Sequence, residues 1–146
     1  MRPVPPPPQS LLPGTIVNAP MKGWLGLTRH FGIVSTETGP DGLPVMIANS
    51  HNSGGPAKES WSKFTEGHAH ERAYYPSALT PQEVIANAAA LFGTRYDLFA
   101  WNCEHFVNAC HGLPARSSQV GKVAQLGRFA LALALSGLVL AAMHSA

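Results

Sequence analysis

Charged residues are scarce in this sequence. Asp, Glu, Lys and Arg make up 12% of the 146 residues, and the formal net charge is only +2. So small a charge, with the lysines and arginines scattered along the chain, argues against a nucleic-acid partner. The low charge also predicts that part of the surface faces something other than water. At this length the chain forms one domain with a modest core of its own.

Cysteine is equally rare. The chain has two, Cys103 and Cys110, which excludes a secreted scaffold held together by several disulfides. If their segment is helical, the two Cα atoms lie roughly 10 Å apart, beyond bridging distance. We therefore expect both thiols to be free.

The two ends of the chain differ in composition from its middle. Residues 1–12 are proline-rich and predict a mostly disordered lead, although its run of four prolines also suits an aromatic groove on a partner. The opening "MRPVPPPPQS" lacks the apolar core of a secretory signal peptide. Residues 13–116 predict the folded domain, and residues 117–146 an apolar C-terminal helix.

The C-terminal segment has two interpretations. Residues 129–143 carry no charge and as a helix measure about 22 Å, short of the roughly 30 Å of a hydrocarbon core. Residues 123–143, with Arg128 snorkelling, approach spanning length and predict a membrane anchor. Lys122 and Arg128 would then keep the main domain on the cytoplasmic side. The alternative is a buried alanine-rich helix in a soluble cytoplasmic protein.

The middle of the chain predicts an α+β domain with a small antiparallel sheet packed against two helices. Strands are expected at residues 15–17, 31–34 and 45–47, and "GPDG" between the last two is typical of a hairpin turn. "SWSKFTEG" and "ERAYYP" are further strand candidates. One helix is predicted in "TPQEVIANAAALFG", where Thr80 and Glu83 have the spacing of a capping box. The other is "NCEHFVNACHG", capped by Asn102 and stopped at Gly112.

Cys103 is the residue most open to interpretation. Four roles are open to a cysteine at this position: a small buried hydrophobe, a metal ligand, half of a disulfide, or a nucleophile. As the first residue after the Asn102 cap, its sulfur lies at the positive end of the helix dipole, which favours thiolate over thiol. Cys110 falls further along the apolar face of the helix and is predicted to belong to the core. A nucleophile needs a base, and the best candidate is His30, a polar residue that enters an otherwise apolar strand.

His30 shares one strand face with Gly32 and Val34. The small Gly32 leaves room for a ligand or another element to approach that face. A thiolate at a helix start and an imidazole on a strand are the arrangement of papain-like thiol enzymes. The other interpretation of His30 is a hydrogen-bonded histidine of the sheet.

"NCEHFVNAC" resembles the signature of the lecithin retinol acyltransferase family, and "RHFGIVS" resembles the strand that carries that family's base. "PGTIV" and "LFGTRYDLFAWNCEHF" are similar to its opening strand and to its approach to the cysteine, so the resemblance covers roughly residues 13–112. It implies a circularly permuted papain-like fold with Cys103 as nucleophile and His30 as general base. Asn102, Glu104 and His105 belong to the motif, and Tyr96 is expected to line the site.

The third polar residue of that family, which orients the base, lies in the strand after the hairpin. Here that position falls on Ala48, whose side chain forms no hydrogen bond. Asn49 or His51 is then expected to substitute, with Asn49 better placed at the strand end. An imidazole that nothing orients loses its tautomer and its position.

The resemblance implies a thiol-dependent acyltransferase or hydrolase that acts on lipid acyl esters through an acyl-cysteine, with backbone N–H groups at the helix start holding the oxyanion. One alternative is a permuted papain-like amidase or peptidase of the cell-wall type. Another is a catalytically degenerate, membrane-associated binding protein, which Ala48 favours. In "GHAHE" two histidines have strand spacing but no convincing third ligand follows, so no metal is expected, and no cofactor.

Overall fold

The computed structural model describes residues 4–21, 29–121, 125, 128 and 131 of the chain. The chain divides into two compact units, Met1–Arg116 and Ser117–Ala146. The first unit holds nine elements along the chain: η1 (Pro8–Ser10), β1 (Ile16–Pro20), β2 (Arg29–Thr38), β3 (Pro44–Ser50), β4 (Gly55–Ser60), α1 (Trp61–Thr65), β5 (Arg72–Tyr74), α2 (Pro81–Ala90) and α3 (Cys103–Cys110).

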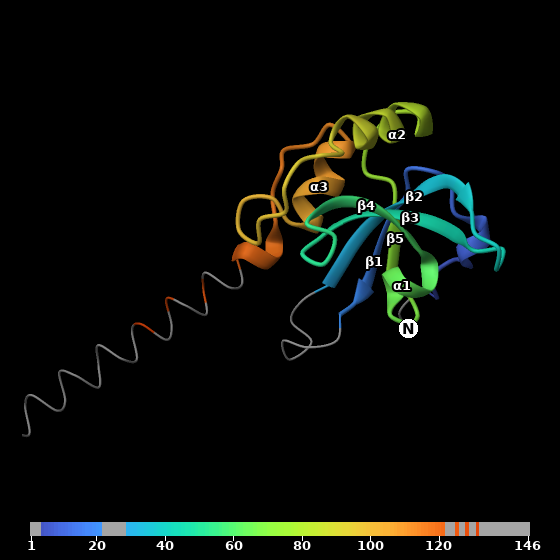
Figure 1. Cartoon of the computed structure of the whole chain (residues 1–146), viewed down its shortest axis with the longest axis horizontal. Coiled ribbons are helices and arrows are strands. Elements are labelled where there is room, and N and C mark those ends of the chain that lie inside the picture. Colours follow the sequence, from blue (N-terminus) through green and yellow to red (C-terminus); the bar gives the residue numbers. More distant parts are fainter. Residues whose placement is uncertain (1–3, 22–28, 122–124, 126–127, 129–130, 132–146) are drawn as a thin grey trace, which may run out of the picture. The chain divides into compact units, whose positions relative to one another are not determined.

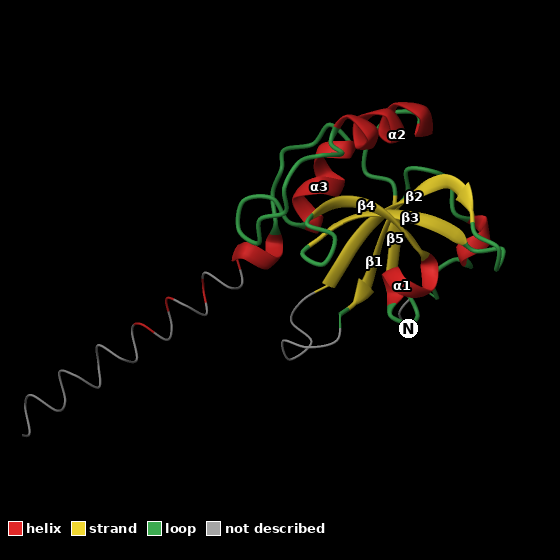
Figure 2. Cartoon of the chain, in the orientation of Figure 1, coloured by secondary structure: helices red, strands yellow, loops and turns green. Residues whose placement is uncertain are grey.

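The strands form one antiparallel sheet in the order β4-β3-β2-β1-β5 (Figures 1 and 2). The predicted hairpin is confirmed, since β2 and β3 pair antiparallel with Ile33 opposite Ile47. Its turn uses Gly42 at a φ of 76°, a conformation that glycine adopts without strain, and the Asp41 carboxylate accepts from the Leu43 amide. The domain is therefore α+β, as the sequence predicted.

Two short elements differ from the prediction. "SWSKFTEG" forms helix α1 and not a strand, because Ser60 caps it by accepting from the Lys63 amide. The strand in this region is β4, just upstream, and its residue types show little strand preference. Its Gly-Pro start and its charged residues are poor strand formers, but an edge strand tolerates them. "ERAYYP" supplies β5, as predicted.

Each face of the sheet packs on different helices. On one face, α2 and α3 bury a core around Ile33, Ile47 and Phe106. On the other face, α1 lays Trp61 and Phe64 against a second cluster that includes Val34, Met46 and Ala48. A sheet covered on both faces keeps its apolar side chains from water, which is the main source of its stability.

Both predicted helices are confirmed together with their caps. Thr80 and Glu83 form the capping box of α2, and Asn102 caps α3. Gly112 has a φ of 66° just past the end of α3, a position suited to glycine. In α3 the stripe of Cys103, Phe106, Val107 and Cys110 is buried, and both cysteines are free.

The described part of the lead contacts the domain. Residues 8–10 form a 3-10 turn, and Leu11 packs against the second cluster. The buried His70 ring lies edge-on to Trp61, at 5.3 Å between centroids, and hydrogen-bonds with the backbone of Pro6. Burial lowers the pKa of His70 despite that bond.

The predicted anchor lies mostly outside the described residues, which in this region are 117–121, 125, 128 and 131. Among the residues that the structure describes, no helix is both long and apolar enough to cross a membrane.

We predict that Gly32→Ala destabilises the domain by roughly 1–3 kcal/mol. A Cβ at this position would lie 2.7 Å from Cε2 of Phe64 and 3.1 Å from the carbonyl oxygen of Ile47, so the ring that covers this face must move. Urea unfolding measures the loss. Gly121→Ala is the control, because nothing lies within 4 Å of its Cβ. Equal stability of Gly32→Ala and the wild type would contradict the packing described.

Candidate active site

Cys103 begins α3 and lies against the start of β2. The Asn102 side chain accepts from the amides of Glu104 and His105, which fixes the first turn of the helix. The Cys103 thiol donates to the carbonyl oxygen of Arg29, at 3.7 Å between sulfur and oxygen. Cys103 is 6% exposed. The sulfur therefore sits at the edge of the core, beside the residue that precedes His30.

His105 completes the cap in an unusual way. Its Nδ1 accepts from the Asn102 amide at 3.1 Å, where a capping box ordinarily has Glu or Gln. Because Nδ1 accepts, a neutral imidazole here carries its proton on Nε2. The predicted role of His105, orienting the helix start, is a role that this hydrogen bond fits.

The His30 imidazole meets two partners from different parts of the chain. Its Nε2 lies 2.9 Å from Oε1 of Glu59, and its ring packs on Phe64 with 4.7 Å between centroids. It also forms a hydrogen bond with the Cys103 side chain. Strand β2, the N-terminal end of α3 and strand β4 thus bring a thiol, an imidazole and a carboxylate together.

The charge state of His30 follows from these partners. Burial is the largest single influence and lowers its pKa, because a low-dielectric environment disfavours the cation. The hydrogen bonds and negative charges of Cys103 and Glu59 together outweigh burial and raise the pKa to about 9. The imidazole is accordingly protonated near neutral pH, with the Glu59 carboxylate and the Cys103 sulfur as its partners.

Glu59 is the site residue that sequence reasoning missed. Its side chain is nearly buried, and beyond His30 its Oε2 lies 3.9 Å from the Lys63 ammonium. In the structure β4 alternates, with Ala57 and Glu59 less exposed than Lys58 and Ser60, but the residue types do not reveal this because the last three are all polar. A lone acidic residue on the inward face of a strand is a candidate for a buried charge pair.

The residues predicted to orient the base lie elsewhere. Asn49 is fully buried and donates from Nδ2 to the carbonyl oxygens of Trp101 and Asn102, at 2.8 Å and 3.2 Å. His51 is exposed and lies edge-on to Tyr96, with 6.0 Å between ring centroids. The contact expected of Asn49 or His51 is made by Glu59, so the prediction is corrected on this point.

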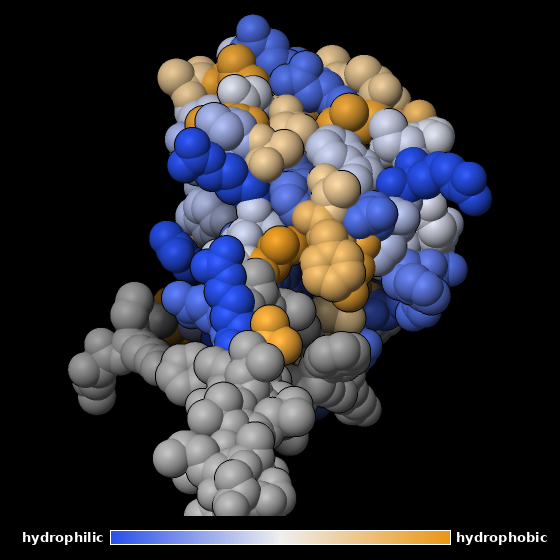
Figure 3. Space-filling view, turned by 90° about the vertical axis from the view of Figure 1, so that its left-hand side faces the viewer, coloured by the Kyte–Doolittle hydropathy of each residue, from blue (hydrophilic) through white to orange (hydrophobic). Residues whose placement is uncertain are grey.

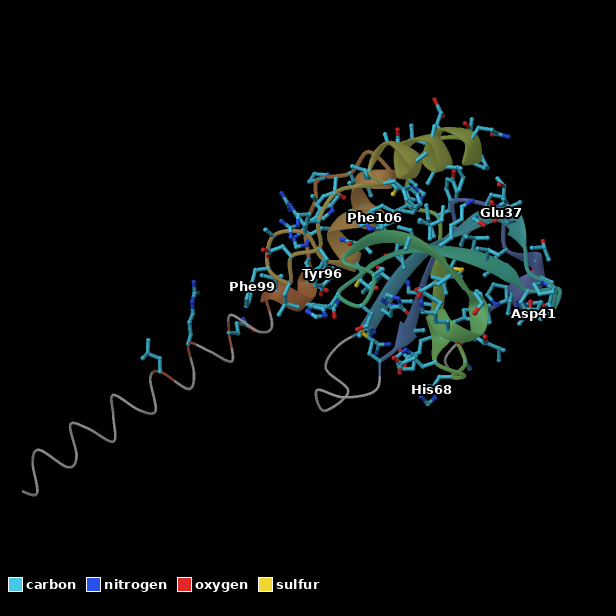
Figure 4. The ribbon with its side chains drawn as sticks, viewed as in Figure 1. Glu37, Asp41, His68, Tyr96, Phe99 and Phe106 are labelled. Carbon is cyan, nitrogen blue, oxygen red and sulfur yellow. The ribbon has the colours of Figure 1, made fainter. Side chains whose placement is uncertain are left out.

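Tyr96, which is expected to line the site, lies near the Cys103 thiol. Burial first, and then the nearby charges of Cys103 and Asp97, raise its pKa. Its backbone amide donates to the carbonyl oxygen of Gly54 at 3.0 Å, which ties the segment before α3 to the β3–β4 turn. In Figure 4 Tyr96 and Phe106 of α3 lie toward the same end of the domain, opposite the end that holds Asp41.

Cys110 provides a contrast within the same helix. It is fully buried, and burial raises the pKa of its thiol to about 12. It belongs to the core, as predicted. The histidines of "GHAHE" diverge, since His68 is exposed while His70 is buried against Trp61. Within the described ranges no three His, Cys, Asp or Glu residues gather as a metal site.

The family model described as lecithin retinol acyltransferase matches residues 48–113. This span contains Glu59 and Cys103, while His30 lies before it and is connected to both by the fold. The match confirms the resemblance that the sequence motifs indicated. No curated protein and no solved structure matches the chain.

We predict that Glu59→Gln lowers the pKa of His30 from about 9, because an amide keeps the shape of the carboxylate without its charge. The histidine signals in a ¹H–¹³C NMR titration measure it, with Glu37→Gln as the control for an exposed sheet glutamate. The stability contributed by protonated His30 is fully present below pH 6.5 and is lost as pH rises through about 9. An unchanged His30 titration in Glu59→Gln would contradict the pair.

We predict that Asn49→Asp costs roughly 1–3 kcal/mol of stability and slows alkylation of Cys103 about tenfold. The new carboxylate has no donor for the two carbonyls that precede Cys103 and repels them. Asn87→Asp is the matched control, since Asn87 donates to the carbonyl oxygen of Cys110 at the other end of α3. Both variants should lose stability, and only Asn49→Asp should slow the alkylation of Cys103. A wild-type alkylation rate of Cys103 in Asn49→Asp would show that Asn49 does not position the thiol.

Proposed function

We propose that this chain, whose residues 48–113 match the lecithin retinol acyltransferase family model, is a thiol-dependent acyltransferase or hydrolase acting on lipid acyl esters. The observation that carries the proposal is the meeting of Cys103, His30 and Glu59 at the start of α3. The strand with the histidine precedes the helix with the cysteine, an order that supports a permuted papain-like arrangement.

In the first step the Cys103 sulfur attacks the ester carbonyl carbon. The C–S bond forms, the carbonyl π electrons move to oxygen, and the thiolate charge passes to that oxygen. On collapse the C–O bond breaks, and the leaving alkoxide takes the proton of the His30 imidazolium. The products of this half-reaction are an acyl-cysteine thioester and a neutral alcohol.

The second step releases the acyl group. The now neutral His30 removes a proton from water or from an acceptor alcohol or amine, whose oxygen or nitrogen attacks the thioester carbonyl. The C–S bond breaks, and the thiolate and the imidazolium are restored. Water gives a free acid and makes the protein a hydrolase, whereas an acceptor makes it a transferase.

Glu59 gives His30 the support that the family pattern places elsewhere. Its carboxylate is hydrogen-bonded to Nε2 of the His30 ring. The other ring nitrogen, Nδ1, is then the one that exchanges protons with the sulfur and the leaving group. The carboxylate also stabilises the imidazolium, as the acid of a Ser-His-Asp triad does. This contact supports an enzyme over the degenerate binding protein that the alanine at position 48 favours.

Two of the backbone amides at the helix start have another partner than an oxyanion. The amides of Glu104 and His105 are used by the Asn102 cap. The positive end of the α3 dipole and the imidazolium are then the sources of positive potential beside the reacting carbonyl. We place the lipid substrate at a membrane surface, with residues 123–143 as the proposed anchor and the catalytic domain on the cytoplasmic side.

Incubation with phosphatidylcholine vesicles is expected to add a fatty acyl group to Cys103, seen as a mass increase on its proteolytic peptide. Cys103→Ser should abolish turnover by a factor of roughly 10³ or more, and His30→Gln should lower it by about 10² or more. Cys110→Ala is the control and should retain turnover. Above pH 9 the rate should fall, because His30 loses the proton that the leaving group needs.

A parallel incubation with muropeptides distinguishes the amidase alternative. Acylation of Cys103 by lipid and not by muropeptide supports the proposal. Cleavage of muropeptide alone would replace it with the cell-wall type of activity. No acyl-cysteine with either substrate, together with a thiol that His30→Gln leaves equally reactive, would refute an enzymatic role.

A further inference from the structure

The loop that leads into α3 exposes two large apolar side chains. Leu98 is 48% exposed and Phe99 is 60% exposed, in the segment of residues 94–101, which we call the 94–101 loop. In Figure 4 Phe99 lies at the margin of the domain, on the side of Tyr96 and away from Asp41 and His68. Exposed aromatic and aliphatic neighbours of this size commonly mark an interaction site.

The exposure is built into a well-fixed loop. The amides and carbonyls of Asp97 and Trp101 bond to each other at 3.0 Å and 2.9 Å and close the loop at its base. The Trp101 indole donates to Oγ1 of Thr94 at 3.0 Å. Because the base is closed twice, the tip keeps its conformation while its apolar side chains point outward.

The tip also satisfies backbone groups internally. The amides of Phe99 and Ala100 donate to Oδ1 of Asp97, at 2.9 Å and 2.7 Å, and the Leu98 carbonyl accepts from Nδ2 of Asn102 at 3.1 Å. A polar backbone group that enters an apolar medium without a partner costs several kcal/mol. These three groups already have partners, so the tip is suited to leave water.

Two further observations point to a lipid surface. Arg95 is exposed at the base of the loop, where a cation attracts anionic headgroups, and Asp97 turns its carboxylate to the loop's own amides. Figure 3, which faces the end of the domain drawn on the left in Figure 1, shows apolar side chains gathered amid polar ones. Two apolar side chains are few for a protein interface, which needs about 800 Å² per partner.

The loop is joined to the site through Asn102. The same side chain that accepts from the first amides of α3 donates to the Leu98 carbonyl at the tip. Cys103 follows Asn102 directly. A surface that contacts the tip therefore lies beside the end of α3 that carries the thiol.

We propose that Leu98 and Phe99 insert into the interfacial region of a lipid surface and seat the Cys103 end of α3 against it. The inference deepens the proposed function, on which the purpose of the contact rests, but the contact is measurable without any reaction. The depth needed is that of an interfacial element, about 5–10 Å.

The test uses the full chain with one added tryptophan as a reporter. Phe99→Trp and the control His68→Trp, in an exposed turn far from Phe99 in Figure 4, are mixed with vesicles of phosphatidylserine and dibrominated phosphatidylcholine. We expect the emission added by Trp at position 99 to fall by about half or more, since bromine quenches at acyl-chain depth. The emission added at position 68 should stay unchanged. Attachment by any other segment leaves both reporters alike, and equal quenching at the two positions overturns the inference.

A second measurement separates this inference from the proposed function. The double variant Leu98→Ser, Phe99→Ser should hydrolyse vesicle phospholipid more slowly by a factor of about ten or more, and a monomeric short-chain ester at the wild-type rate. An equal loss on both substrates would assign the two residues to folding and overturn the lipid contact. Quenching at position 99 without hydrolysis of any ester would refute the proposed function and leave the lipid contact standing.

Discussion

The hydrogen bonds of Asn102 fix the position of the start of α3, and the candidate site depends on them. Its Oδ1 accepts from two helix amides, its Nδ2 donates to Leu98, and its backbone amide donates to His105. Its carbonyl oxygen accepts from Asn49 and from the Phe106 amide. A buried residue with its polar groups paired in this way has one low-energy position, and the next residue along the chain inherits it. That residue is Cys103.

Two opposing effects act on the pKa of His30, and the interactions with its partners outweigh the effect of burial. Moving an imidazole out of water favours its neutral form, and for His70 and His111 burial does lower the pKa. His30 is buried as well, yet its pKa is raised, because its hydrogen bonds and electrostatic interactions with Cys103 and Glu59 outweigh burial. His111 instead lies between the Ser77 hydroxyl and the Gly14 carbonyl, neutral groups that tie α3 to the strand side of the domain. The same residue type thus serves structure in one place and charge in the other.

The sequence predicted those parts of the fold that depend on local chemistry. The caps at Thr80 and Asn102 and the turn at "GPDG" follow from side chains that bond to backbone within a few residues. Cys103 could be distinguished from Cys110 for the same reason, since only one of them follows a cap. These features need no knowledge of what packs against them.

The parts that could not be predicted depend on contacts between distant segments. Strand β4 exists because β3 pairs with it, although its own residues favour other conformations. Without β4, nothing distinguishes Glu59 from an ordinary surface glutamate. The family pattern places the orienting side chain in the strand after the hairpin, next to His30, and therefore predicts Asn49 or His51. The residue that meets the imidazole is 29 positions away in sequence, on the strand beyond.

The two cysteines give the protein an internal reference for its own integrity. Both lie on one helix and one buried face, but Cys110 is a thiol whose pKa of about 12 keeps it protonated in any ordinary buffer. A thiol reagent that modifies Cys110 has therefore met an opened chain, whereas modification confined to Cys103 reports an intact fold. The ratio of the two products in one mass spectrum records how much of a sample is native, with no mutation or added label. Helix α3, with one cysteine at each end of its eight residues, therefore reports whether the domain is folded.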